Sequence, residues 1–462
     1  MKHSLIILFL LASAPLATPV FAHAPKDPAP EKQKLTNDWS RSVLTQLRVE
    51  RTTDKARHGG VRHTKATLSA LDWLVKHQQT EGQWSAHQLE KACAGQRRSK
   101  PCDAISEGAQ WPSRHVEVGL TGLVLLSFAG RGNTYLEAEK PKYAPAIDRA
   151  VTWLLATQVK GTNEVTAGFF GSGDQVKAED FAIYNHAIAT LAICELLLGT
   201  GDQKRLGNAA QAGVEWCLRA QNPGFAWKYT YLSGRNSTPS TIWLSNAVLI
   251  GEECAKAGLI EIAPERFLAS RKGTLAWLAA VTSSVSGIIG YEAPGDMGSQ
   301  LNAYGDEYPF SKEHSTNSAG GLFYLALEGG TRAEAKAEES ESATADANHR
   351  ETMKSLVALL MRSPPSWETA VGKKKSKVNF YYWAFATQAM ALTGTENWAE
   401  WRKTLEKEVV THQLTTGCAK GSWDPIGEWG IVGGRVYSTA MAVLALESSY
   451  RYQLAPTPSA KK

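Results

Sequence analysis

The sequence predicts an all-α protein, an (α/α)6 toroid in which six helical hairpins close into a ring. The first observation is a repeated phrase: a small residue, an apolar residue and any residue precede Trp, and Gln follows five positions later. Complete copies lie at Trp73–Gln78, Trp153–Gln158 and Trp216–Gln221, and a copy at Trp277 lacks the Gln. Self-similarity at long spacing indicates a repeat architecture. The second observation is that very little of the chain alternates with a period of two, so we expect few strands.

Each hairpin is predicted to pair an outer helix with an inner one. The Trp-bearing helices place apolar residues at helical spacing on one side, as at Leu71, Leu74 and Val75, and keep a charged face. The fifth and sixth outer helices are expected at Met353–Met361 and Trp398–His412.

The second helix of each hairpin is apolar almost all round, which indicates burial on most sides. These inner helices are expected at Val116–Ala129, Phe181–Leu198, Ile242–Ala257, Asn317–Leu327, Phe380–Leu392 and Tyr437–Tyr450.

Closure of the hairpins into a ring follows from the inner helices. An open solenoid is the alternative way of stacking hairpins. It would leave one apolar face of the inner helices in water, so the pattern favours a closed ring around a central cavity. We also expect Trp153 to be a buried contact between neighbouring hairpins.

The N-terminal segment has the features of a secretory signal. Residues 1–22 combine an early positive charge at Lys2, an apolar stretch from Leu5 to Ala12 and a plausible cleavage site at Ala22. We therefore expect an exported protein, periplasmic or extracellular. The stretch is too short to span a bilayer as a mature helix, and no later segment is expected to span one.

The rest of the chain divides by composition. Residues 23–63 are expected to be a polar linker and residues 64–455 the toroid. Within the toroid, residues 331–349 read as a flexible charged insertion. Residues 456–462 read as a disordered tail.

Charge argues against nucleic acid as a partner. The net charge is +5 over 462 residues, and Lys and Arg are scattered. A phosphate backbone needs a basic stripe, and none is seen.

Six cysteines remain after the signal segment. Cys93 and Cys102 lie close together in a polar loop and are the candidate disulfide of an oxidising compartment. Cys194, Cys217 and Cys254 lie in apolar helical patterns and are expected to be buried small hydrophobes. No C-x-x-C occurs and no Cys/His set has zinc spacing, so no metal site is predicted and no cofactor is expected.

Specific motifs support the toroid. Gln78-x-x-x-Gly82-x-Trp84 is complete, and weaker echoes run from Gln221 to Trp227 and from Gln413 to Trp423. The first resembles the QW motif of the squalene-cyclase and protein-prenyltransferase toroid superfamily. Physically, such a Gln can satisfy exposed groups at a helix end while the Trp covers a neighbouring outer helix, which staples hairpins together.

The C-terminal third resembles exported bacterial toroid proteins of unsettled activity. The motifs that carry this resemblance include Tyr381-Tyr382-Trp383, Gly421-Ser422-Trp423-Asp424-Pro425 and Gly433-Gly434-Arg435-Val436-Tyr437. The resemblance covers about residues 64–455. It implies the toroid fold, and a fold does not by itself give a function.

The functional motifs of the superfamily are missing. The cyclase acid motif Asp-x-Asp-Asp does not occur, and no Asp-x-Cys is followed by a suitably placed His as in the prenyltransferase zinc set. We therefore expect a toroid that binds a ligand or a protein partner at its cavity without that catalysis. The alternative is a divergent enzyme, either a cyclase or transferase or a carbohydrate-active hydrolase or lyase.

The enzyme alternative has candidate residues. His186 opens the second inner helix and could be a general base, or a hydrogen-bonded structural residue. Carboxylates occur in two loops, as Asp306 and Glu307 and as Asp424 and Glu428. Hydrolases on (α/α)6 barrels use two carboxylates across an aromatic cleft; ordinary caps and salt bridges are the other interpretation.

Other candidates concern binding and burial. Glu195 must either face the cavity or form a salt bridge, because an unpaired buried carboxylate is costly. Arg435 could hold an anionic group or pair with Asp424. The expected binding residues at the mouth are Tyr381, Tyr382, Trp383, Gln388, Trp429, Arg435 and Tyr437.

Overall fold

The protein is described by a computed structural model. It describes residues 60–86, 89–93, 102, 116–136, 142–177, 181–298, 315–335, 343–369, 376–394, 396–427 and 429–452. All of these belong to one compact unit, Trp39–Lys462. The expected signal segment 1–22, most of the linker 23–63 and the tail 456–462 lie outside the described residues.

Six hairpins each run from an outer helix to an inner one. The outer helices are α2 (Gly60–Lys76), α5 (Ala144–Thr157), α7 (Asn208–Ala220), α9 (Pro264–Val281), α11 (Ala343–Leu360) and α13 (Asn397–Val410). The inner helices are α4 (Glu117–Ala129), α6 (Ala182–Thr200), α8 (Thr238–Lys256), α10 (Thr316–Ala335), α12 (Phe380–Thr393) and α14 (Gly430–Leu446).

Four short helices complete the described secondary structure. They are α3 (Leu89–Cys93), α15 (Ser448–Arg451), the 3-10 helix η2 (Gly173–Lys177) and the π-helix η3 (Gln203–Gly207). The β-bridges with both partners in the described ranges are isolated ones, Gln158 with Phe170 and Thr282 with Ile289. The prediction of an all-α protein is confirmed.

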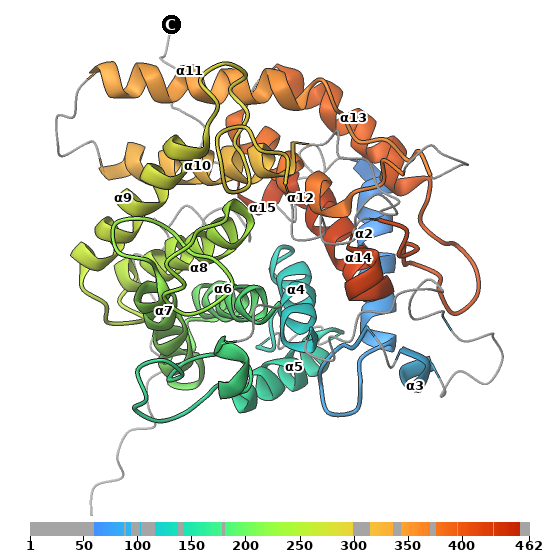
Figure 1. Cartoon of the computed structure of the whole chain (residues 1–462). Helices are drawn as coiled ribbons and strands as arrows, with labels where there is room; N and C mark the ends of the chain where they lie inside the picture. The colour runs from blue at the N-terminus through green and yellow to red at the C-terminus, as the bar shows by residue number, and fades with distance from the viewer. Residues whose placement is uncertain are drawn as a thin grey trace, which may run out of the picture. The chain divides into compact units, whose positions relative to one another are not determined.

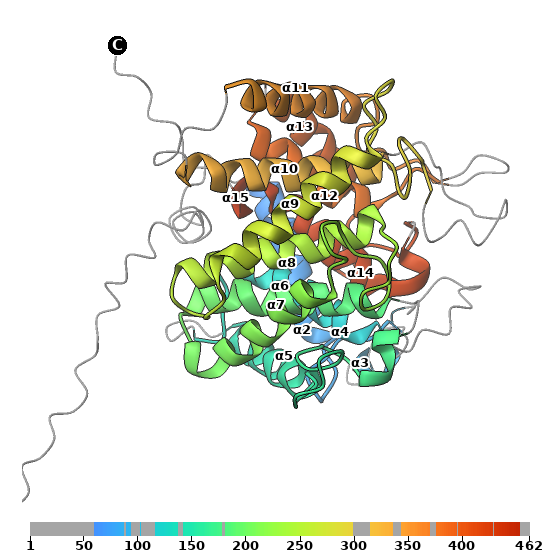
Figure 2. The ribbon, with the colours of Figure 1, turned by 60° about the vertical axis from the view of Figure 1, so that its left-hand side comes forward.

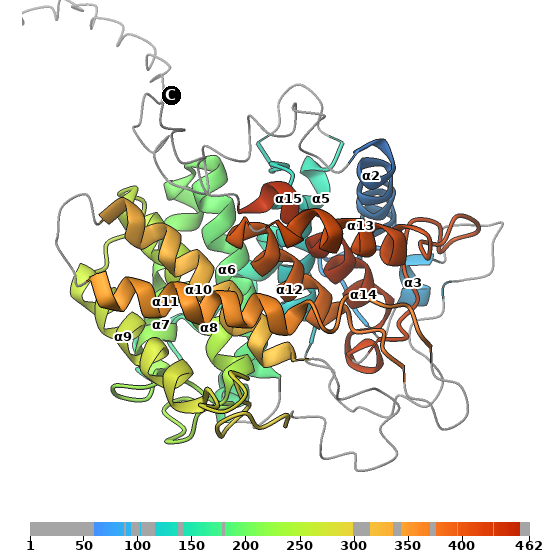
Figure 3. The same ribbon diagram turned by 90° about the horizontal axis from the view of Figure 1, so that it is seen from above.

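The inner helices form a closed ring. Each of α4, α6, α8, α10, α12 and α14 packs against the next, and α14 packs against α4. Figure 1 shows the outer helices α5, α7, α9, α11 and α13 around them, and Figure 2 shows α7, α8 and α9 side by side. The red α14 and the blue α2, from opposite ends of the chain, are neighbours (Figures 1 and 3). The ring of six hairpins is therefore shut, and the open solenoid is excluded.

Burial follows the apolar pattern of the inner helices. In α4 every residue after Glu117 is buried, and in α6 burial extends almost unbroken from Ala182 to Leu198.

By length and composition α6 is also the one helix of the described ranges apolar enough to cross a membrane, contrary to our expectation that no such segment follows the signal region. Of its qualifying stretch, 89% is buried inside the protein, as expected of a core helix.

The repeated Gln joins neighbouring hairpins at four of the six junctions. The Gln78 side-chain amide donates to the carbonyl of Gly82 in its own loop, at 2.7 Å, and to that of Ala146 in α5, at 2.8 Å. Three further glutamines do the same: Gln158 to Gly168 and Ala209, Gln221 to Phe225 and Ser270, and Gln413 to Gly421 and Ala66. The last pair joins the sixth hairpin to the first.

Gly and Trp complete these junctions. Gly421 has φ +98°, and a Cβ there would lie 2.2 Å from the Ser69 carbonyl oxygen, so only glycine allows the loop to approach α2 this closely. The Trp423 indole N–H donates to the Val409 carbonyl in the last turn of α13 at 2.7 Å. Trp84 and Trp227 bond the last turns of α2 and α7 in the same way. Each Trp thus caps its own outer helix. The sequence had suggested instead that the Trp covers the next outer helix.

Three expectations need correction. Trp153 is only partly buried, whereas Trp216 is 1% exposed. The interval 331–349 is in large part helix, because α10 continues to Ala335 and α11 begins at Ala343; residues 336–342 lie outside the described ranges. The first turn of α2 begins at Gly60, inside the expected linker. In α10 and α11, good helix-forming Ala and Glu extend the helices past their apolar segments.

The two tryptophans give a stability prediction. Trp216→Ala should lower the free energy of unfolding by about 3–5 kcal/mol, because it empties a buried site and removes the indole bond to the Val165 carbonyl. Trp153→Ala should lower the free energy of unfolding by less than half as much, because Trp153 is only partly buried. Urea unfolding of both variants measures this, and equal losses would contradict the assigned burial.

Candidate functional site

A cavity opens at the N-terminal ends of the inner helices. It encloses about 1190 Å³ of empty space, counting the part open to solvent. Every inner helix contributes residues at or near its first turns, such as Leu120 of α4, Asn185 of α6 and Thr316 of α10. The closed ring therefore creates the predicted central cavity.

The described lining is aromatic and apolar, with neutral polar groups. Its aromatic side chains are Phe181, Tyr184, Trp243, Tyr381, Trp429 and Tyr437. Asn185, Asn317 and Asn379 supply amides, and Ser315 and Thr316 supply hydroxyls. No Asp, Glu, His, Lys or Arg lines the cavity among the residues that the structure describes. This surface suits an apolar body with a few hydrogen-bonding groups.

An aromatic layer lies beneath the cavity. Trp243 lines both the upper cavity and a smaller pocket below it. Its ring meets Phe385 edge-on at 5.1 Å between centroids, and Phe385 meets Phe323 at 5.7 Å. These three rings come from the consecutive inner helices α8, α10 and α12, and all three line the smaller pocket.

Below this layer a buried ionic cluster ties the opposite ends of the inner helices together. Arg451 is 1% exposed and bonds Glu195 of α6 at 2.5 Å, Glu447 at 3.2 Å and the Leu126 carbonyl of α4 at 2.6 Å. Tyr452 donates to the second oxygen of Glu195 at 2.6 Å. Of the two alternatives for Glu195, the structure therefore shows the salt bridge and not a cavity-facing carboxylate. The charge of Arg451 offsets the cost of burying this carboxylate.

His186 does not reach the cavity. Its Nδ1 accepts the Phe170 N–H at 3.0 Å, which leaves Nε2–H to donate to the Gly213 carbonyl at 3.2 Å. The ring lies against Phe169 and Trp216, and burial lowers its pKa to about 3. The general-base role is therefore not supported: the imidazole joins the second and third hairpins.

Asp424 and Arg435 form a pair beside the cavity. Arg435 is 5% exposed and bonds Asp424 at 2.7 Å and the Ser422 hydroxyl at 3.2 Å. Neither lines the cavity, so the structure does not place the expected catalytic Asp424 or anion-binding Arg435 in the site. The other catalytic candidates, Asp306, Glu307 and Glu428, lie outside the described residues.

The predicted aromatic residues divide between site and core. Tyr381, Trp429 and Tyr437 line the cavity. Tyr382 and Trp383 are fully buried on other sides of α12, and the Tyr382 hydroxyl donates to the Ser363 carbonyl at 2.9 Å. Gln388 lines only the lower pocket. Successive helical residues point in different directions, so one stripe of α12 faces the centre.

Several lining residues were missed by the sequence analysis. Tyr184, Asn185, Trp243, Asn317 and Asn379 were not proposed as binding residues, although all lie near the start of an inner helix. Polar or aromatic residues in the first turns of a helix that is otherwise apolar were the available signal.

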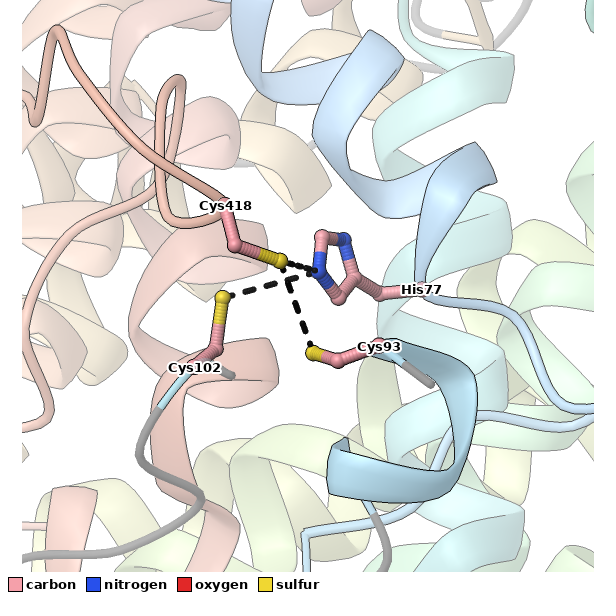
Figure 4. Close-up of side chains that lie close together, drawn as sticks. All are labelled: His77, Cys93, Cys102 and Cys418. Carbon is pink, nitrogen blue, oxygen red and sulfur yellow. Dashed lines mark hydrogen bonds between the residues drawn. The ribbon is translucent and has the colours of Figure 1, made fainter. Parts of the chain in front are cut away.

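Three cysteines and a histidine form a second cluster, away from the cavity. His77 follows α2, Cys93 ends α3, Cys102 follows in the same loop, and Cys418 lies between α13 and α14. The two expected disulfide partners, Cys93 and Cys102, are both present as free thiols. Figure 4 shows their sulfurs and that of Cys418 turned toward the His77 ring. Spacing along the chain could not predict this set, because His77 and Cys418 are 341 residues apart.

The fold and the cavity define an α/α-toroid protein with an apolar central cavity. No protein-family model and no curated protein matches the sequence. Among solved structures, an unsaturated glucuronyl hydrolase specific for heparin is similar at 13% identity and a TM-score of 0.49, over 85% of this chain and 96% of that one.

Two further solved structures are similar. A type II terpene cyclase from Scytonema, in complex with geranylgeranyl dihydroxybenzoate, shares 13% identity at a TM-score of 0.45, over 84% of this chain and 97% of that one. A GH76 α-mannanase from Bacteroides thetaiotaomicron shares 10% identity at a TM-score of 0.47, over 72% of this chain and 86% of that one. The likeness gives no activity for this chain.

The burial of His186 gives a prediction on acid stability. Its folded-state pKa of about 3 lies below the ordinary value of 6.5, so the unfolded chain binds a proton first as the pH falls. This group favours folding above pH 6.5, and that contribution is lost between pH 6.5 and 3. His186→Gln should therefore lose less stability from pH 7 to about pH 4.5, by about 2–3 kcal/mol relative to the parent. Urea unfolding at both pH values measures this, and parallel losses would contradict it.

Proposed function

We propose that this protein binds a small, mainly apolar molecule with a few hydrogen-bonding groups in its central cavity. The observation that carries the proposal is the lining: aromatic and apolar side chains with neutral amides and hydroxyls, all at the entrance of a closed ring. A charged ligand would lose its hydration there without gaining a counter-charge from the described lining. Apolar surface, in contrast, gains about 25 cal/mol per Å² on burial.

The polar groups have a clear place in this proposal. Asn185, Asn317 and Asn379 lie at the starts of three different inner helices, α6, α10 and α12. Their amides can meet a hydroxyl or carbonyl of the ligand from several directions, with the Asn379 Oδ1 already accepting the Tyr382 N–H at 2.9 Å. These contacts would fix the orientation of the ligand while the aromatic rings hold its body. Export to the periplasm or the extracellular space is part of the proposal and rests on the signal-like residues 1–22.

Filling the cavity tests the proposal. Leu123 is 3% exposed and lines the cavity, whereas Leu268 is 48% exposed on α9. Leu123→Trp should weaken binding of the uncharged fluorescent dye prodan, and of farnesol as its competitor, by about tenfold or more, equivalent to ~1.4 kcal/mol. Leu268→Trp adds the same ring elsewhere and should leave both affinities unchanged. Equal affinity of all three proteins would overturn the proposal.

An enzyme of the same scaffold is the second candidate, and one observation favours it. The segment 299–314, which contains Asp306 and Glu307, starts after Gly298 and returns at Ser315, both of which line the cavity. Glu428 likewise precedes the lining residue Trp429. Hydrolysis or elimination of a glycoside, or protonation of an alkene, needs carboxylates beside such an aromatic cleft.

Isosteric changes test the second candidate. Turnover of a panel of polysaccharides and polyprenyl substrates by the purified chain should fall by about 100-fold or more in Asp306→Asn, Glu307→Gln or Glu428→Gln if that residue is the general acid. Asp424→Asn is the matched control, because Asp424 pairs with Arg435 outside the cavity. A chain without any turnover, or with turnover unaffected by all three changes, is not an enzyme of this kind.

A further inference from the structure

Three sulfur atoms and one imidazole nitrogen converge at the junction of the first and last hairpins. The Cys418 Sγ lies 3.2 Å from the His77 Nε2 and 3.6 Å from the Cys93 Sγ, and the Cys102 Sγ lies 3.5 Å from the same Nε2. All four atoms lie within 4.8 Å of one another, and all four residues are buried (Figure 4).

These separations fit one tetrahedral metal ion. With metal–sulfur bonds of about 2.3 Å and a metal–nitrogen bond of about 2.0 Å, zinc ligands are spaced by about 3.8 Å between sulfurs and 3.5 Å between sulfur and nitrogen. The two sulfur–nitrogen distances, 3.2 and 3.5 Å, and the sulfur–sulfur distance of 3.6 Å lie close to these values, and the remaining pairs lie within 4.8 Å. Three cysteines and one histidine are also a ligand set that soft-ligand zinc sites use.

The histidine is oriented as a ligand. The Nδ1 of His77 lies 2.7 Å from the Trp73 carbonyl oxygen, one turn earlier in α2, and the ring stacks on Trp73 at 4.3 Å between centroids. Because Nδ1–H donates to that carbonyl, the lone pair of Nε2 points at the sulfurs. A backbone acceptor on the far nitrogen is the usual support of a metal-bound histidine.

Metal binding sets the charge of such a site. A divalent ion with three thiolates and a neutral imidazole carries one negative charge, and binding releases the three thiol protons to solvent.

We propose that His77, Cys93, Cys102 and Cys418 form a structural zinc site that fastens the sixth hairpin to the first. Four protein ligands leave no position for water or substrate, and none of the four lines the cavity, so the ion is structural and not catalytic. Its four ligands come from three segments, and the loop it closes spans 341 residues. A link across so long a loop removes much of the freedom of the unfolded chain.

A disulfide is the competing arrangement. Any two of the three cysteines could pair by oxidation in an exported protein, and the third thiol would remain beside His77. The pair would need to approach from the present separation to the S–S bond length of about 2.05 Å. The two arrangements exclude each other, because a disulfide sulfur is not a thiolate ligand.

Metal content of the purified full-length chain tests the proposal. The chain, prepared without chelator or reductant from zinc-supplemented culture, should contain about one zinc per molecule. Cobalt(II) exchanged into the site should give the intense sulfur-to-metal charge-transfer band and visible bands of a tetrahedral thiolate complex. Mass spectrometry after alkylation in denaturant should find Cys93, Cys102 and Cys418 as free thiols. Absence of metal, or a disulfide within this trio, would overturn the proposal.

Matched variants locate the site. Cys418→Ala should reduce the zinc content at least tenfold, whereas Cys254→Ala, which removes another buried thiol, in α8, should retain it. If Cys418→Ala does not fold, the cobalt spectrum and the thiol analysis of the parent chain still decide the question. Retention of zinc by a folded Cys418→Ala protein would refute the assigned ligand set.

Hydrogen exchange tests the fastening role. Removing the metal with a chelator should speed amide exchange at the end of α2 and in residues 414–422, at the junction of the last hairpin with the first. The α7 and α9 junction, held by Gln221, should be unchanged and is the internal control. Faster exchange at both junctions alike would contradict a local fastening role.

Discussion

The double hydrogen bond of one glutamine side chain is the contact on which the ring depends. An amide NH2 has two donors, and at four junctions they are shared between a carbonyl of the glutamine's own loop and a carbonyl of the next outer helix. Buried polar groups must be satisfied, so each junction has a specific geometry as well as apolar contact. The copy at Gln413 reaches Ala66, and this contact turns a row of hairpins into a ring.

Closure has a consequence for the interior. The inner helices can be apolar on nearly every side because each has a neighbour on both flanks, and the ring encloses a space that no single hairpin could form. That space is divided by the layer of Trp243, Phe385 and Phe323 and closed at one end by Arg451 and Tyr452. Access to the cavity is therefore from the side where the inner helices begin.

Charge is distributed unevenly between the two ends of the ring. At the closed end, Arg451 is paired with Glu195 and Glu447 inside the protein, where the ions bind each other and fix the C-terminal segment. At the open end, the described lining is neutral. The ions at the closed end hold the structure together, and the open end presents aromatic surface and a few amides. The His77 and cysteine cluster lies at the junction between the first and last hairpins.

The sequence determined the architecture because its signals are local. Apolar periodicity, all-round apolar helices and the Trp-to-Gln phrase each act within one or two turns, so the six hairpins could be predicted from them, whereas Glu195 was left with two alternatives. Tertiary structure alone decided which candidates meet. His186 packs between hairpins, Asp424 pairs with Arg435, and His77 joins Cys418 across 341 residues of chain. Ligand spacing along a sequence reveals a metal site only when one local segment supplies the ligands. Here closure of the ring brings together residues that are far apart in the chain.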